Sequence, residues 1–284
     1  MDPRDDFRAR RTKPRRAHNF PLPMNDAENA AKSIPLAPGC EIAALDPRGI
    51  IAISKRAGYS SHPNPDGKRG HPMVLAPYNF DGEYFSWEDE SGHKRRLWLA
   101  NRLDSPTSGI VIAASDPDAA AAAREAFRSR RAEKIYRAIC VCRAPARSGF
   151  WRDTLFERKF AGFVRNSALR APAGAAKKAE AKFSVEGFDK NNYGLCLVKL
   201  EPLTGLTHQL RVQCAKHAMP ILGDATYGDF RANRRLRAAS GIGRLFLHCS
   251  QTVLHLEIAG NAADFSASAP LPESFNIMME RRKD

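Results

Sequence analysis

The chain has no long hydrophobic run. Its longest apolar stretches, residues 109–114 and 119–123, fall far short of the roughly 18–20 residues that a membrane-spanning helix needs. No apolar signal core follows the basic N-terminus, and early aspartates and scattered prolines argue against an amphipathic transit helix. We therefore expect a soluble, cytoplasmic protein with no membrane partner.

Cysteine spacings typical of metal or redox sites are also missing. Six cysteines are spread along the chain, at positions 40, 140, 142, 196, 214 and 249. None forms a Cys-x-x-Cys pair, so this pattern predicts reduced thiols rather than a disulfide framework. A metal site made of Cys214, His217, His208 and His248 would match no common zinc spacing, and we expect no metal.

Positive charge is what the chain has in excess. It carries 45 Lys and Arg against 31 Asp and Glu, which gives a net charge of +14. Such an excess does not define a fold, but it favours a polyanionic partner, either nucleic acid or an acidic membrane surface. The 284 residues, 43% of them hydrophobic, can bury a sizeable core and suit one large domain or two small ones.

Residues 1–40 are expected to be a basic, flexible N-terminal extension, followed by a globular domain over 41–284. The block from Arg8 to Arg16 has no apolar periodicity, and such blocks cannot form a packed core. It can bind phosphates or only keep the chain soluble, and the sequence leaves both open. Regular structure is expected to begin near Gly49.

Hydrophobic patterning predicts more strands than helices. The predicted strands are 50–54, 110–114, 133–142, 183–188, 195–200, 245–248 and 252–258. Helices are predicted from Pro117 to about Arg131 with Asp116 as the cap, over 207–218, over 231–239 (helix or loop), and after Pro272. Loops, with room for one hairpin, are predicted over 64–95, and a basic flexible loop over 171–178. Strands and helices do not alternate, which favours an α+β fold with a mixed, mostly antiparallel sheet over a doubly wound one.

Four short segments carry the polar groups that could do chemistry: 101–109, 134–138, 203–212 and 220–228. Each has an ordinary structural explanation: a turn-capping Asp, a core Tyr, a capped helix and a Gly-containing turn. If the third segment begins a helix at Thr207, His208 and Arg211 share one face near its positive end.

In this order, the segments resemble the RluA family of pseudouridine synthases. The family pattern is matched at Ser54–Gly58 with His62-Pro63, Arg102–Gly109, Lys134–Ala138, Thr207–Arg211, Pro220–Gly228 and Leu247–Cys249. The resemblance covers about residues 49–260. Any single match is weak, but the ordered set is specific.

Three positions depart from the family pattern. Asn101 stands in place of His, Leu206 in place of Arg, and Arg56 in place of Pro. None removes a presumed catalytic group. Leu206 removes a cation beside the predicted helix at 207–218, which puts family-typical phosphate contacts there in doubt, and Asn101 can change how the loop around Asp104 is held.

The resemblance implies a pseudouridine synthase fold in which 41–284 is the catalytic domain. It implies isomerisation of uridine to pseudouridine in ribosomal or transfer RNA, with no cofactor and no metal. The catalytic residues would be Asp104, Tyr136 and Arg211. Asp104 would be the nucleophile, Arg211 would keep it ionised and aimed, and Tyr136 would stack on uracil and help remove the C5 proton.

The target base must be flipped out of an RNA stem to reach Asp104. Arg102 matches the family residue that fills the vacated space, and Thr107, His208 and Gln209 are further candidates for substrate binding. The basic segments 152–182 and 231–237 would hold the RNA backbone, so binding should weaken with salt. We expect a monomer.

Two alternatives stay open. A non-catalytic RNA-binding or ribosome-assembly factor could use the same fold, although the intact Asp104, Tyr136 and Arg211 count against it. A basic hydrolase using Asp104 and His208 would need a second placed carboxylate or nucleophile, and the sequence offers none.

Overall fold

One large sheet organises the molecule. The computed structural model describes residues 24–63, 70–142, 147–160, 163–167, 176–189, 193–258 and 260–280. In these ranges thirteen strands join into a single sheet, and all pairings between named strands except that of β6 with β12 are antiparallel. The predicted α+β class is therefore confirmed. No helix in the described ranges is both long and apolar enough to cross a membrane.

The elements follow one another with few helices between the strands. The strands are β1 (Glu41–Leu45), β2 (Ile50–Lys55), β3 (Tyr78–Asn79), β4 (Tyr84–Glu88), β5 (Lys94–Leu99), β6 (Ser108–Ala114), β7 (Ala132–Val141), β8 (Ser148–Phe160), β9 (Phe163–Ser167), β10 (Ala176–Phe188), β11 (Leu195–Pro202), β12 (Leu247–Ile258) and β13 (Asn261–Ser268). The helices are α1 (Met24–Lys32), α2 (Pro117–Arg128), α3 (Gln209–Lys216), α4 (Phe230–Ser240) and α5 (Glu273–Glu280).

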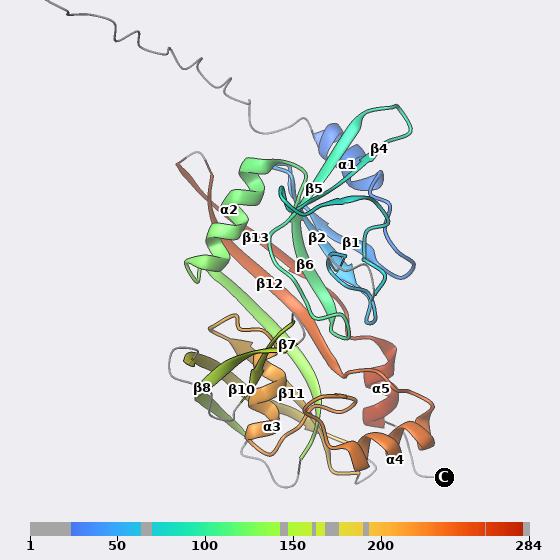
Figure 1. The fold of residues 1–284 in the computed structure, drawn as a ribbon, viewed down its shortest axis with the longest axis vertical. Helices are drawn as coiled ribbons and strands as arrows, with labels where there is room; N and C mark the ends of the chain where they lie inside the picture. Colours follow the sequence, from blue (N-terminus) through green and yellow to red (C-terminus); the bar gives the residue numbers. More distant parts are fainter. Residues whose placement is uncertain are drawn as a thin grey trace, which may run out of the picture.

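Two long strands form the middle of the molecule. The strand order is β3-β4-β5-β6-β12-β7-β11-β10-β8-β9, with β2 also paired to β6, β1 to β2, and β13 to β12. In Figure 1, β12 and β7 run through the centre, with α1, α2 and the first six strands toward one end and β8, β10, β11 and α3 to α5 toward the other. Loops at this centre can therefore combine groups from both halves.

The centre of the sheet is apolar. Every residue of β6 is buried, as are the residues of β2 from Ile50 to Ile53. The two strands pair antiparallel, with Ile51 opposite Ala113. Runs of β-branched residues suit strands that are covered on both faces, which is why the predictions at 50–54 and 110–114 are confirmed.

The parallel pairing of β6 with β12 depends on a glycine. Gly109 has a φ of +111° and lies opposite Cys249. A Cβ at this position would overlap the backbone of Cys249. Only glycine allows both this conformation and this close approach, so the Thr107-Ser108-Gly109 motif brings β12 beside the loop that precedes β6.

The predicted helices appear with small shifts in their ends. Asp116 caps α2 as expected, because its side chain accepts hydrogen bonds from the N–H groups of Asp118 and Ala119. The helices predicted at 231–239 and after Pro272 are α4 and α5. The helix predicted to begin at Thr207 begins at Gln209, since His208 has a left-handed conformation with φ of 58°.

The prediction that regular structure begins near Gly49 is wrong. Helix α1 and strand β1 come earlier, and Ala31, Ile34, Ala37 and Cys40 are buried in the main core. Small and apolar residues near the end of α1 provide a packing surface. The basic block before α1 dominates the composition of residues 1–40, so this surface was not predicted. The basic block 8–16 lies outside the described residues.

Residues 176–178 of the segment expected to be a basic loop belong to strand β10. Residues 152–160 continue β8, and Lys177 and Lys178 lie in β10, paired with Leu155 and Thr154 of β8. Lysine and arginine side chains are compatible with the exposed face of an antiparallel sheet, so composition alone is a poor guide here. Residues 168–175 lie outside the described residues. The strands predicted at 245–248 and 252–258 are one strand, β12.

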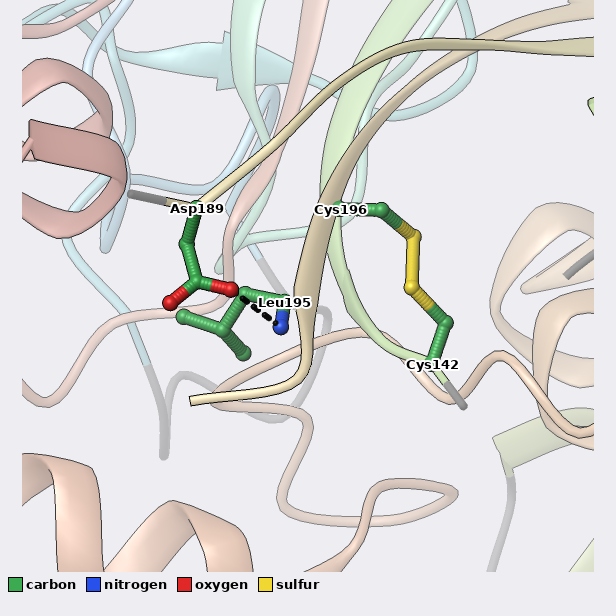
Figure 2. Close-up of a disulfide and its surroundings, with 4 residues drawn as sticks. All are labelled: Cys142, Asp189, Leu195 and Cys196. Carbon is green, nitrogen blue, oxygen red and sulfur yellow. Dashed lines mark hydrogen bonds between the residues drawn. A yellow bond between two sulfur atoms is a disulfide. The ribbon is translucent and has the colours of Figure 1, made fainter. Parts of the chain in front are cut away.

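The prediction of reduced thiols is wrong for one pair of cysteines. Cys142 and Cys196 form a disulfide across the end of the β7–β11 pair, with Cα atoms 6.3 Å apart (Figure 2). Antiparallel pairing places Cys196 opposite Cys140 and so brings it next to Cys142, a proximity that no spacing along the chain reveals. Beside it, the backbone N–H of Leu195 donates to Asp189. The other four cysteines are free and buried.

Candidate active site

A cleft of about 1460 Å³ lies where the two halves of the sheet meet. Its walls come from the loop before β6 (Ala100–Thr107), one face of β7, and the segment from Pro202 to Arg211. All seven residues predicted to act line it: Arg102, Asp104, Thr107, Tyr136, His208, Gln209 and Arg211. The fold therefore brings together residues that are more than 100 positions apart in the sequence.

Arg211 joins two carboxylates. On one side its Nε and Nη2 donate to the two oxygens of Asp224 at 2.7 and 2.8 Å. On the other side its Nη1 donates to Oδ2 of Asp104 at 3.2 Å. The Asp224 side chain is fully buried, whereas a quarter of the Asp104 side chain is exposed. The carboxylate that faces the cleft is thus Asp104.

Asp224 is the residue that orients Arg211, and sequence reasoning gave it no role. Burial acts to raise its pKa, but hydrogen bonds from Arg211 and from the N–H groups of Thr226 and Tyr227 outweigh burial and hold the pKa below its usual value. Asp224 therefore stays ionised, and its two oxygens fix the plane of the guanidinium. Its position in the matched segment 220–228 was the available signal.

His208 approaches Asp104 from the same element. Its Nε2 lies 3.6 Å from Oδ2 of Asp104, and its Nδ1 is 3.1 Å from the hydroxyl of Tyr227. The guanidinium carbon of Arg211 lies 5.3 Å from the centre of the Tyr227 ring. The expectation that His208 and Arg211 share one face of a helix is not met, because His208 precedes α3, but both side chains approach the same oxygen of Asp104.

Asp104 is also held through its loop. The N–H of Thr107 donates to its backbone carbonyl at 3.0 Å. Lys55, which is 1% exposed, donates to the carbonyls of Arg56, Tyr59 and Ser105 at 3.2, 2.7 and 3.1 Å. Burial lowers the pKa of Lys55 to about 8. Lys55 lies in the matched segment 54–58, but its role as a tie between that turn and the Asp104 loop was not predicted.

Tyr136 forms the floor of the cleft beside β12. It is 9% exposed, and burial raises the pKa of its hydroxyl well above 10. The phenol is therefore neutral near pH 7. A neutral ring on a cleft wall offers a flat apolar surface for stacking together with one polar hydroxyl.

Arg102 is exposed at the mouth of the cleft. Its Nη1 lies 2.8 Å from Nε2 of His62, and the ring of His62 stacks on Tyr78 with centroids 5.6 Å apart. The guanidinium thus contacts His62 while the residue stays exposed.

Two predicted substrate-binding residues are turned into the protein. Thr107 is 2% exposed. The Gln209 amide bonds to Glu180, Gln213, Thr204 and Leu206. The contacts of Gln209 indicate that it stabilises the loop between β11 and α3. Direct substrate binding by Thr107 and Gln209 stays a prediction.

The departures from the family pattern have local structural consequences. Oδ1 of Asn101 accepts the N–H of Ile112 at 2.7 Å and so ties the Asp104 loop to β6. Leu206 packs against the small cluster of Leu155, Ala179 and Val212. Among the described residues, no group of three or more His, Cys, Asp or Glu side chains could hold a metal ion.

Comparisons with known proteins indicate one family. The sequence profile of the RNA pseudouridylate synthase family matches residues 49–216. The chain is 29% identical over 226 residues to the tRNA pseudouridine synthase C of Yersinia pestis, covering 77% of this chain and 82% of that protein. It is also 29% identical over 187 residues to the ribosomal large subunit pseudouridine synthase C of Haemophilus ducreyi, covering 66% of this chain and 56% of that protein.

A solved structure agrees as to the fold. Human RNA Pseudouridylate Synthase Domain Containing 1 superposes with a TM-score of 0.61 at 20% identity, over 85% of this chain and 88% of that one. The profile match spans more than half of the residues and includes Asp104, Tyr136 and Arg211. The chain belongs to the RNA pseudouridylate synthase family.

Proposed function

We propose that this protein isomerises uridine to pseudouridine in tRNA or rRNA, with Asp104 as the nucleophile. The observation that carries the proposal is the Asp104–Arg211 pair at the cleft surface, with Tyr136 in the same cleft. Relatives with both kinds of RNA in their names support the two substrate classes equally.

The two carboxylate oxygens of Asp104 differ in their contacts. Arg211 and His208 both approach Oδ2, whereas none of the described residues donates a hydrogen bond to Oδ1. The guanidinium beside Oδ2 orients the carboxylate. Oδ1 is thus the oxygen with an open approach to a bound nucleotide.

The reaction needs only these groups and a proton acceptor. The bond between N1 and the ribose breaks, the uracil turns, and C5 becomes bonded to the same ribose carbon. C5 loses one proton and N1 gains one, so no electrons leave the substrate and no group is transferred. Because burial keeps Tyr136 protonated, its ring is proposed to stack on uracil, and its hydroxyl oxygen can accept the C5 proton only as its own proton moves on.

RNA would reach the cleft along basic walls. Arg124, Arg130, Lys177 and Lys178 line the cleft beside Arg102. A base inside a stem must be extruded at a cost of a few kcal/mol, and in this proposal the guanidinium of Arg102, which contacts His62, stacks where that base was. The basic helix α4 adds a further surface for the RNA backbone.

The catalytic unit in this proposal is one copy of the chain acting in the cytoplasm. The unit includes residues 31–40, because they pack in the same core as β6.

Pseudouridine mapping of total RNA from cells with and without the gene tests the proposal. The expected result is at least one site that loses its modification and regains it with the wild-type protein but not with Asp104→Asn. An RNA-binding factor without catalysis would leave every site modified. A site restored by Asp104→Asn would contradict the nucleophile assignment.

A further inference from the structure

Lys134 is a cation on the cleft wall for which the fold supplies no counter-charge. It lies two residues before Tyr136 in β7, and successive side chains of a strand point to opposite faces. Ala132, Lys134 and Tyr136 accordingly share one face, and all three line the cleft. Among the described residues, none makes a hydrogen bond or an ion pair with the Lys134 ammonium.

The surroundings of this ammonium are neutral. Burial lowers the pKa of Lys134. The titratable group that acts on it most is the Cys249 thiol, whose own pKa is raised by burial. Tyr136 is also protonated for the same reason. By contrast, the buried Lys55 donates to three carbonyls. Lys134 is desolvated without such hydrogen bonds. This is expected for a cation that pairs with an anionic group of a bound ligand.

The ammonium lies against the loop that precedes α3. A Cβ on Gly205 would be 3.6 Å from Nζ of Lys134, an ordinary contact distance, so the ammonium lies beside this residue. The next residue, Leu206, stands where the family pattern has arginine. Lys134 thus brings a cation from β7 to this loop, which itself has no cation at position 206.

We infer that Lys134 binds a phosphate next to the target uridine and so holds the flipped nucleotide against Tyr136. The inference rests on the proposed function. Along β7 the two side chains are about 7 Å apart, which is the scale of the distance between a nucleobase and the phosphates on its own ribose. A compact ammonium with three donors suits a phosphate oxygen approached from one side.

The test compares the charge of Lys134 with that of an exposed lysine. Lys134→Met removes the charge but keeps the long apolar stem, Lys134→Arg keeps the charge, and Lys94→Met removes a charge from the exposed end of β5. The probe is the RNA stem-loop that carries the mapped uridine. We expect Lys134→Met to bind it roughly tenfold more weakly and to lower the slope of log K against log salt by about 0.7–0.9. Lys134→Arg and Lys94→Met should keep the wild-type slope.

A neutral phosphate identifies the contact. The same stem-loop is made with a methylphosphonate on the 5′ or the 3′ side of the target uridine. One of the two should weaken binding of the wild-type protein but cause no further loss in Lys134→Met. The inference is wrong if the neutral phosphate weakens binding by the same factor in the wild type and in Lys134→Met. It is also wrong if the wild type is insensitive to both neutral positions. This last result needs only the wild-type protein, so it can be obtained even if Lys134→Met does not fold.

Failure of the proposed function looks different. A wild-type protein that binds the stem-loop but forms no pseudouridine contradicts the proposed function. A wild-type protein that forms pseudouridine, beside a Lys134→Met variant with wild-type affinity and salt slope, contradicts only the assignment of Lys134.

Discussion

The two sides of Arg211 have opposite character. Toward Asp224 the ion pair is bidentate and fully buried, and toward Asp104 it is a single contact to a carboxylate that is partly exposed. A buried pair with both oxygens occupied can orient a side chain but cannot react. The open side keeps one carboxylate oxygen accessible. The comparison therefore assigns a structural role to Asp224 and supports the proposal that Asp104 is the carboxylate that reacts.

Removing the shared arginine should have the largest effect, because it breaks both sides at once. Arg211→Ala leaves Asp224 buried without its cation, which should lower the free energy of unfolding by about 3–5 kcal/mol. It also leaves Asp104 unaimed, so turnover should fall to near background. Urea denaturation and a tritium-release assay measure the two effects. Wild-type turnover in a folded variant would show that Asp104 has another partner.

Changing only the buried side should mainly affect stability. Asp224→Asn keeps the shape but removes the charge, and we expect a loss of about 2–4 kcal/mol with a smaller fall in turnover. Asp264→Asn, in an exposed pair with His255, is the control and should change stability by less than about 0.5 kcal/mol. Equal losses of unfolding free energy in Asp224→Asn and Asp264→Asn would contradict the structural role of the buried pair.

The same variant has a signature in acid. The pKa of Asp224 is lowered in the folded state, so its contribution is present above the unfolded pKa of about 3.9 and is lost as pH falls through the folded value. The stability difference between wild type and Asp224→Asn should therefore shrink below about pH 4. A difference that stays constant down to pH 2 would contradict this.

Lys55 tests how the Asp104 loop is tied down. Its pKa is lowered by burial to about 8, so the unfolded chain binds more protons between pH 8 and 10.5. The unfolding free energy of the wild type, relative to Lys55→Met, should rise across this window by on the order of 3 kcal/mol. Denaturation at several pH values measures the rise, and a flat difference would place the Lys55 ammonium in contact with solvent.

His208 should show the smallest effect. It approaches the oxygen that Arg211 already holds, at a longer distance of 3.6 Å. His208→Asn tolerates the left-handed backbone at this position, and we expect only a several-fold loss of turnover with stability almost unchanged. A loss as large as that of Arg211→Ala would give His208 a direct part in the chemistry.

The site was easier to predict than its surroundings. Asp104, Tyr136 and Arg211 could be named because each lies in a short, ordered motif. Their closeness depends on the parallel pairing of β6 with β12, and Gly109 in the motif encodes that pairing locally. Strands 50–54 and 110–114 were also predictable from local sequence, because short runs of β-branched apolar residues strongly favour buried strands.

What was missed depends on contacts between distant segments. The bidentate hold of Asp224 on Arg211 and the bridge between Cys142 and Cys196 arise only when elements meet in space. The packing of Ala31 and Ile34 was hidden by the basic block before them. Strand β8 was not predicted from the sequence, because a strand with one exposed face can carry many charges and so lack a clear apolar run.

Pseudouridine formation by Asp104→Asn on the mapped stem-loop, measured together with RNA affinity and melting temperature, tests the central claim most directly. The account predicts no product above background, affinity within a few-fold of wild type and an almost unchanged melting temperature. Product formed at the wild-type rate by this folded, RNA-binding variant would contradict it.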